Sequence, residues 1–241
     1  IAKESSVKRT HIILAAVMLL SLLLIPLPLH AGDRGQQLVV YVCGADYVDI
    51  QGYNQNNAWK TYRLWTDPHR CVTKKVSNWW WKGDVTLTAY DPTGIMHLAT
   101  VNVPATQSGN EFYVDVPPST MSDVYMERAD LWVRGNAFYS QESYIGIYRM
   151  DCSGYVSFVW QLPAAPDTTR LKDYAYEIAM WDLTPGDAIN DQESGDYGHV
   201  IMFAGWEDYD ALAFWAYEEN GDTGAARLLR QLVQTDSGYS V

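Results

Sequence analysis

The sequence changes character at one short segment, Pro117 to Thr120. Before this segment, from Gln36 to about Val116, short runs of β-branched and aromatic residues alternate with turn residues, which is typical of strands. After it, apolar residues recur every three or four positions, as in amphipathic helices, and strand-like runs return from about residue 198. We therefore expect a small antiparallel β domain over 36–118, of sandwich type, and a second domain over 120–241. Helices followed by strands predict the α+β class, with helices packed on a small antiparallel sheet.

The second domain is expected to hold three helices and two paired strands. The segment 119–135 is predicted to be a helix with Ser122 as its N-cap and Gly135 as its stop. A second helix is predicted to begin at Asp151, and 170–180 is expected to form a weaker third one. The runs 198–206 and 212–219 are predicted to be strands joined by a polar turn.

Three consecutive tryptophans, Trp79 to Trp81, stand in the β domain. In a strand, two of these side chains would lie on one face and the third on the other. One interpretation is a platform on which sugar rings stack. The other, which we favour, is packing in the core and against the second domain, because tryptophan usually occupies cores and interfaces.

The first 31 residues are expected to be a secretory signal. Lys3, Lys8 and Arg9 precede an apolar run over 12–27 that ends near Ala31, which is the order of a signal peptide. The run is shorter than the roughly 20 residues that a spanning helix needs, so contact with the membrane is expected only during export. An uncleaved membrane anchor is the alternative.

Export bears on the three cysteines, because disulfides persist outside the cytoplasm. Cys43 and Cys71 both lie in the strand-rich half and are predicted to pair. Cys152 is then left as a free thiol.

The formal net charge is −12, and removal of the signal segment makes it about −14. Nucleic acids are bound through clustered lysine and arginine residues, so a nucleic-acid partner is not expected. The sequence contains neither a Cys/His cluster with metal-ligand spacing nor a glycine-rich phosphate loop, so no metal or organic cofactor is expected. Nothing in the sequence indicates an oligomeric state.

Cys152 stands at the predicted start of a helix, where unpaired backbone N–H groups and the helix dipole favour a thiolate. Such a nucleophile needs a base. His69 and His97 lie in the β domain, which leaves His199, at the head of a predicted strand. Glu218 on the neighbouring strand could orient the imidazole. A packed cysteine and a structural histidine remain the alternative interpretation of these residues.

Three motifs in order resemble the NlpC/P60 superfamily of papain-like cysteine peptidases. They are "DCSGYV" at Asp151, "LTPGDAI" at Leu183 and "GHVIMFAG" at Gly198. The resemblance covers roughly residues 120–220, and "FYSQESYIGIYRMDCSG" with "WAYEEN" is similar to an actinobacterial-type subgroup. It implies that Cys152 is the nucleophile and His199 the base.

The chain departs from that family at the third catalytic position. Most members carry a second histidine, an asparagine or a glutamine on the strand after the catalytic histidine, and this chain has no histidine there. Either Glu218 or Glu219 must serve, and we choose Glu218. The resemblance also implies that Tyr139 lies near the nucleophile. We expect Tyr139 and Ser153 to contact the oxyanion or the substrate.

The resemblance implies a secreted or envelope-located cysteine hydrolase whose partners are peptidoglycan stem peptides. The expected bond joins D-glutamate to a diamino acid. Two alternatives stay open, a catalytically inactive envelope protein that binds through its β domain, and an amidase or acyltransferase that acts on a substrate outside the wall.

Overall fold

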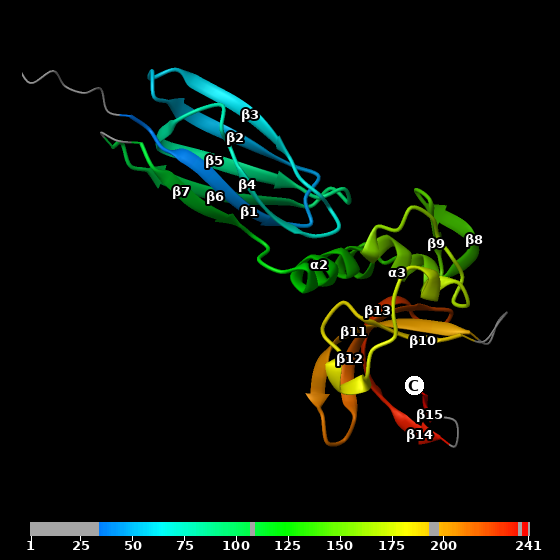
Figure 1. Ribbon diagram of the computed structural model, residues 1–241. Helices are drawn as coiled ribbons and strands as arrows, with labels where there is room; N and C mark the ends of the chain where they lie inside the picture. The colour runs from blue at the N-terminus through cyan, green and yellow to red at the C-terminus, as the bar shows by residue number, and fades with distance from the viewer. Residues whose placement is uncertain (1–33, 107–108, 193–197, 236–237, 241) are drawn as a thin grey trace, which may run out of the picture.

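The computed structural model describes residues 34–106, 109–192, 198–235 and 238–240. The expected signal segment, 1–31, lies outside the described residues. Figure 1 shows a strand-rich domain connected through the helix α2 to a second group of helices and strands. No helix in the described part of the chain is long and apolar enough to cross a membrane.

The first domain consists of two small sheets. One has the order β4-β1-β7 and the other β3-β2-β5-β6. The strands are β1 (Gln37–Cys43), β2 (Tyr47–Asn54), β3 (Trp59–Trp65), β4 (Cys71–Lys75), β5 (Trp81–Tyr90), β6 (Met96–Val103) and β7 (Glu111–Val116). Alternate residues of both sheets form one core, with Leu38, Val48, Ile50, Leu87 and Val114 all buried.

The expectation of a purely antiparallel domain is wrong for one strand pair, because β1 and β7 run parallel. These two strands lie about seventy positions apart in the sequence. Local turn patterns predict only neighbouring hairpins, such as the one between β5 and β6, where Gly94 has a φ of 92° and donates its N–H to the Asp91 carbonyl.

The tryptophan cluster does not form one strand. Only Trp81 belongs to a strand, at the start of β5, and its side chain is fully buried in the β-domain core. Trp79 packs against the same core, and Lys60 lies over its ring at 4.9 Å. The Trp80 ring lies so close to Gly109 that a Cβ there would meet it at 2.2 Å. These contacts agree with core packing.

Cys43 and Cys71 form the expected disulfide. They stand directly opposite each other where β1 and β4 pair, so the sheet register brings the two side chains together. Cys152 is the free cysteine and is buried. A disulfide is typical of proteins that fold outside the cytoplasm.

The second domain places two helices against a four-stranded antiparallel sheet of order β10-β11-β12-β13. Its helices are α2 (Met121–Arg134) and α3 (Cys152–Trp160), and its 3-10 turns are η1 (Leu171–Asp173) and η2 (Met180–Asp182). Its strands are β8 (Ser140–Ile145), β9 (Tyr148–Met150), β10 (Ala188–Asp191), β11 (His199–Asp208), β12 (Ala213–Asn220), β13 (Gly224–Gln231), β14 (Val233–Thr235) and β15 (Gly238–Ser240). The N-cap of α2 is Thr120 rather than Ser122, because the Thr120 side chain accepts the Asp123 N–H.

The expected α+β class, a papain-like domain of helices packed on a small sheet after a β domain, is wrong for this chain. Strands make up 49% and helices 15% of the structure. The expected helix over 170–180 is only the two 3-10 turns η1 and η2, and its Tyr174, Tyr176 and Ile178 are exposed. Since these apolar residues alternate with a period of two, a helix there would have no continuous face to bury.

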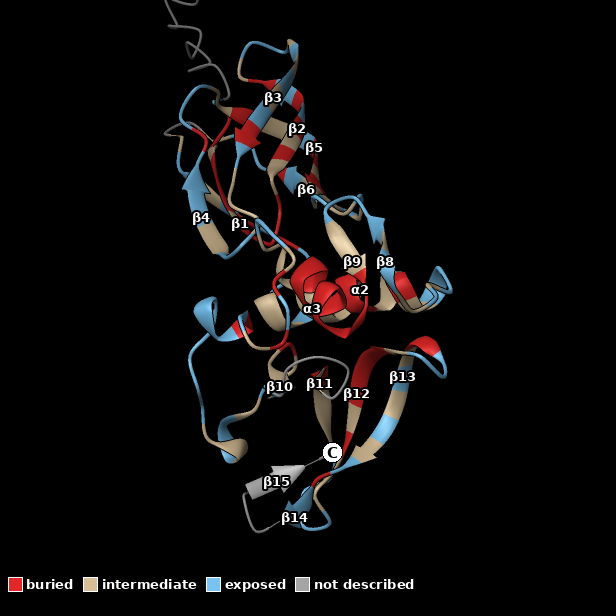
Figure 2. Cartoon of the chain, turned by 90° about the vertical axis from the view of Figure 1, so that its right-hand side faces the viewer, coloured by how far each residue is buried: buried red, intermediate tan, exposed pale blue. Residues whose placement is uncertain are grey.

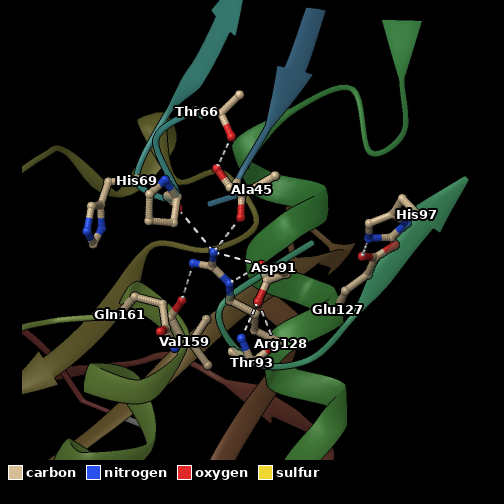
Figure 3. Close-up of polar contacts among 12 residues, drawn as sticks. Ala45, Thr66, His69, Asp91, Thr93, His97, Glu127, Arg128, Val159 and Gln161 are labelled. Carbon is tan, nitrogen blue, oxygen red and sulfur yellow. Dashed lines mark hydrogen bonds and ion pairs between the residues drawn. The ribbon is translucent and has the colours of Figure 1, made fainter. Parts of the chain in front are cut away.

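Arg128 of α2 joins the two domains through a fully buried guanidinium (Figure 3). It pairs with Asp91 at 2.8 Å and donates to the carbonyls of Gly44 and Pro68 in the β domain. It also donates to the Val159 carbonyl in the last turn of α3 at 3.1 Å. A cation is favoured at that end of a helix, so Arg128 ties the β domain to α3.

Candidate active site

The helix α3 begins at Cys152, and its start is held by Asp151. The Asp151 side chain accepts the Gly154 N–H at 2.8 Å, which makes it the N-cap that the sequence predicts. Gly154 is required by close packing, because a Cβ there would lie 1.8 Å from the Arg149 carbonyl oxygen. Figure 2 shows α3 almost wholly buried. Cys152 is therefore held on a rigid element.

A network of polar side chains fixes Asp151. The Arg149 guanidinium forms an ion pair with the Asp151 carboxylate. The Ser153 hydroxyl, which is buried, donates to the other Asp151 oxygen at 3.2 Å. Burial would lower the pKa of Arg149, but the hydrogen bond and charge of Asp151 outweigh it and the pKa is raised. Ser153 thus supports the cap while it also lines the hollow beside Cys152.

His199, the first residue of β11, lies between Cys152 and Glu218. Its Nε2 is 3.0 Å from Glu218 Oε2, so Nδ1 is the ring nitrogen left for the thiol. The hydrogen bond with Cys152 and that with Glu218 outweigh burial and raise the pKa of His199 to about 9. At neutral pH the imidazole is therefore protonated beside the sulfur. A cation beside a cysteine sulfur favours nucleophilic chemistry at that sulfur.

Glu218 is almost fully buried and receives a second cation. Its Oε1 forms an ion pair with Arg230 of β13, while its Oε2 faces His199. Burial alone would raise the pKa of Glu218, but the hydrogen bonds from His199 and Arg230 outweigh it and the pKa is lowered. The carboxylate is thus held ionised against the imidazole.

Arg230 is not among the residues that the sequence analysis places in the site, because no strand is expected there over 223–233. The segment forms β13, and Ala226 pairs with Glu218 on β12. With a period of two, Arg230 shares the face of Ala226 and hence of Glu218. Recognising a strand there would have placed this cation near the site.

Two hollows meet at Cys152. One is lined by Arg149, Asp151, Ser153 and Thr168, and the other by His199, Glu218, Asn220 and Arg230. Tyr139 and Gly198 line both hollows together with Cys152. A chain lying across both hollows would pass the sulfur at its middle.

Tyr139 precedes β8 and borders the sulfur on the side shared by the two hollows. Its hydroxyl oxygen accepts a hydrogen bond from the Gln141 amide at 3.0 Å. This bond leaves the hydroxyl hydrogen free to be donated elsewhere. Tyr139 is thus positioned to donate to an oxygen that becomes negative near Cys152.

The structure brings five of the predicted site residues to one place, namely Cys152, His199, Glu218, Tyr139 and Ser153. Glu219 points to the opposite face of β12, and its carboxyl oxygens make no hydrogen bond to any described residue. Within the described ranges, no group of three or more His, Cys, Asp and Glu side chains could hold a metal ion.

Comparisons with models of protein families, with curated proteins and with solved structures found no match. We therefore infer a function from the geometry of the site and from the sequence motifs.

Proposed function

We propose that this chain is an extracytoplasmic cysteine hydrolase of the NlpC/P60 type that cleaves amide bonds in peptidoglycan stem peptides. One observation carries the proposal: the His199 imidazole lies between the Cys152 sulfur and the buried Glu218 carboxylate, beside open hollows. Nucleophile, base and orienting group in that order are the arrangement of covalent acyl-transfer catalysis.

The reaction follows from the protonation states. The Cys152 thiolate attacks the carbonyl carbon, and the carbonyl oxygen becomes negative. The backbone N–H of Cys152 and the Tyr139 hydroxyl stabilise that oxygen. The His199 imidazolium then gives its proton to the leaving amine as the C–N bond breaks, which leaves a thioester on Cys152.

The second half of the reaction consumes water. Neutral His199 takes a proton from a water molecule, which attacks the thioester carbonyl. The C–S bond breaks, the acid product leaves, and the thiolate and imidazolium are restored. Glu218 holds the imidazole in place and stabilises its charged form in both halves.

Two observations support the substrate class. Two hollows adjoin at Cys152, and a peptide bound across its scissile bond needs room on both sides of that bond. The Cys43–Cys71 disulfide agrees with a protein that works outside the cytoplasm, in a secreted or envelope location. The choice of the bond between D-glutamate and the diamino acid rests on the motifs alone.

Digestion of purified stem peptides tests the proposal. The purified protein is incubated with stem tripeptides of the sequence L-Ala-D-Glu-diamino acid and with the corresponding tetrapeptides. The products are identified by mass spectrometry. Cleavage after D-glutamate that is absent in Cys152→Ala supports the proposal. A reactive Cys152 that cleaves none of these peptides would contradict the wall substrate and favour another amide or acyl transfer. An unreactive Cys152 would favour an inactive binding protein.

A further inference from the structure

Glu219 is a buried acid that the proposed reaction does not use. Side chains alternate along β12, so Glu218 faces His199 while Glu219 points to the other face, towards α3. Glu219 is fully buried, and neither carboxyl oxygen has a hydrogen-bond partner among the described residues. An ionised carboxylate in such a place is costly, whereas a neutral acid is far less so.

The charged groups around Glu219 leave its carboxyl without a cation. The Asp151 carboxylate at the start of α3 acts electrostatically on Glu219, and Glu219 acts in the same way on the buried Tyr155. On β9, Arg149 is paired with Asp151. On its own strand, Tyr217 shares its face, and the charged groups near Tyr217 are Asp130 and Arg134 of α2 and Arg227 of β13. Burial, and next the charge of Asp151, raise the pKa of Glu219 to about 8.

We infer that Glu219 is a positioning residue, which forms with Asp151 a buried acid pair that carries one negative charge beneath the helix of Cys152. The single charge stays on Asp151, where Arg149 and the N–H of Gly154 stabilise it. Glu219 keeps its proton and fills the space behind the helix start without a second charge.

Loss of that proton has a direct consequence for the site. Two carboxylates close together in a buried place repel each other. The repulsion acts on Asp151, which caps α3 through Gly154, and both charges disfavour a thiolate on Cys152. The proton on Glu219 therefore keeps the first turn of α3 in place, and the chain loses this support in alkaline solution.

The titration of Glu219 is measured directly, on the full chain labelled with ¹³C at the glutamate carboxyl carbons. Nuclear magnetic resonance follows each carboxyl from pH 4 to 10, and the Glu219 signal is assigned by its loss in Glu219→Gln. We expect a midpoint near pH 8, and a lower one in Asp151→Asn, which keeps a capping oxygen but removes the charge. A midpoint below pH 5 would overturn the inference. So would a midpoint that does not move in Asp151→Asn.

The effect on the site is read from the rate of Cys152 alkylation against pH. Compared with Glu219→Gln, the unmodified chain should lose reactivity as the pH rises through about 8. Glu177→Gln, at an exposed glutamate, is the matched control and should follow the unmodified chain. Identical profiles for the unmodified chain and Glu219→Gln would overturn the inference. If Glu219→Gln does not fold, Glu219→Met serves as the second neutral variant.

The inference rests on the proposed function only for the importance of Cys152. A chain that cleaves no stem peptide but whose Glu219 titrates near pH 8 would contradict the proposed function and still support the acid pair. A chain that cleaves stem peptides but whose Glu219 titrates below pH 5 would support the proposed function and contradict the acid pair.

Discussion

His199 and Glu218 lie on adjacent strands with Nε2 and Oε2 3.0 Å apart, and Arg230 holds the far side of the same carboxylate. Where the motifs lead one to expect a neutral orienting group, this chain has a buried charge. A carboxylate orients the ring as a neutral acceptor would, and it also stabilises the imidazolium. The ion pair with Arg230 keeps this carboxylate ionised despite its burial.

Glu218→Gln keeps an acceptor beside His199 but removes the charge. A charge-assisted hydrogen bond contributes roughly 1.5–3 kcal/mol, so we expect kcat/KM to fall by about 10- to 100-fold. The pKa of His199 should also fall from about 9. Steady-state kinetics and histidine resonances against pH measure the two effects. Asp210→Asn, at an exposed turn, is the control and should leave the kinetics unchanged. An unchanged kcat/KM in Glu218→Gln would contradict a role of Glu218 in the reaction.

In Arg230→Met, the pH below which kcat/KM falls should be higher than in the unmodified chain. The hydrogen bonds from His199 and Arg230 together lower the pKa of Glu218 against burial, so the loss of Arg230 leaves His199 alone to oppose burial and that pKa rises. A depressed carboxyl pKa supports the folded, ionised state above the unfolded pKa, and this support is lost as the pH falls. In Arg230→Met the loss begins nearer neutrality.

The measurement is kcat/KM between pH 4 and 7. Arg227→Met is the matched control, because Arg227 lies on the same strand, over the Trp215 ring at 4.6 Å. An acidic limit that is the same in Arg230→Met and in the unmodified chain would contradict the role of Arg230.

Arg128→Met should destabilise the chain strongly. It leaves the buried Asp91 carboxylate and three carbonyls without their cation, and breaking one partner of a buried ion pair costs about 3–5 kcal/mol. Urea unfolding followed by tryptophan fluorescence measures the loss. Arg134→Met, which removes an exposed ion pair with Asp130, should change the free energy of unfolding by less than about 1 kcal/mol. Equal effects would show that Arg128 is not the connection between the domains.

Replacing Cys43 and Cys71 together by alanine should cost about 2–4 kcal/mol of unfolding free energy, because the bond restricts the unfolded chain. The disulfide lies in the β domain, away from α3, so the alkylation rate of Cys152 should stay the same at a temperature where the variant is folded. A reduced alkylation rate in the folded variant would mean that the two domains are more tightly coupled than these contacts indicate.

Local chemistry in the sequence predicted local structure well. The start of α3 at Asp151 and the Cys43–Cys71 bond each depend on residues whose preference is strong and whose partners are near in sequence or on a paired strand. The motifs also directed attention to Cys152 and His199, which the fold brings together.

Long-range pairing could not be predicted in the same way. Two features depend on how strands distant in sequence pair with each other. They are the parallel pairing of β1 with β7 and the ion pair between Arg230 and Glu218. The propensities of 170–180 allow a helix, but its Tyr176 is exposed, so tertiary packing does not stabilise one there. The burial of the Glu219 carboxyl without a hydrogen-bond partner among the described residues depends on the packing of β12 against α3, which no local pattern predicts.

The pH dependence of Cys152 alkylation, with His199→Ala beside the unmodified chain, tests the central claim most directly. We predict a thiol that reacts fast well below pH 8, because a protonated His199 stabilises its thiolate, and that slows markedly in His199→Ala. A thiol that ionises near pH 8.5, as free cysteine does, and that is indifferent to His199 would contradict a working Cys152–His199 pair.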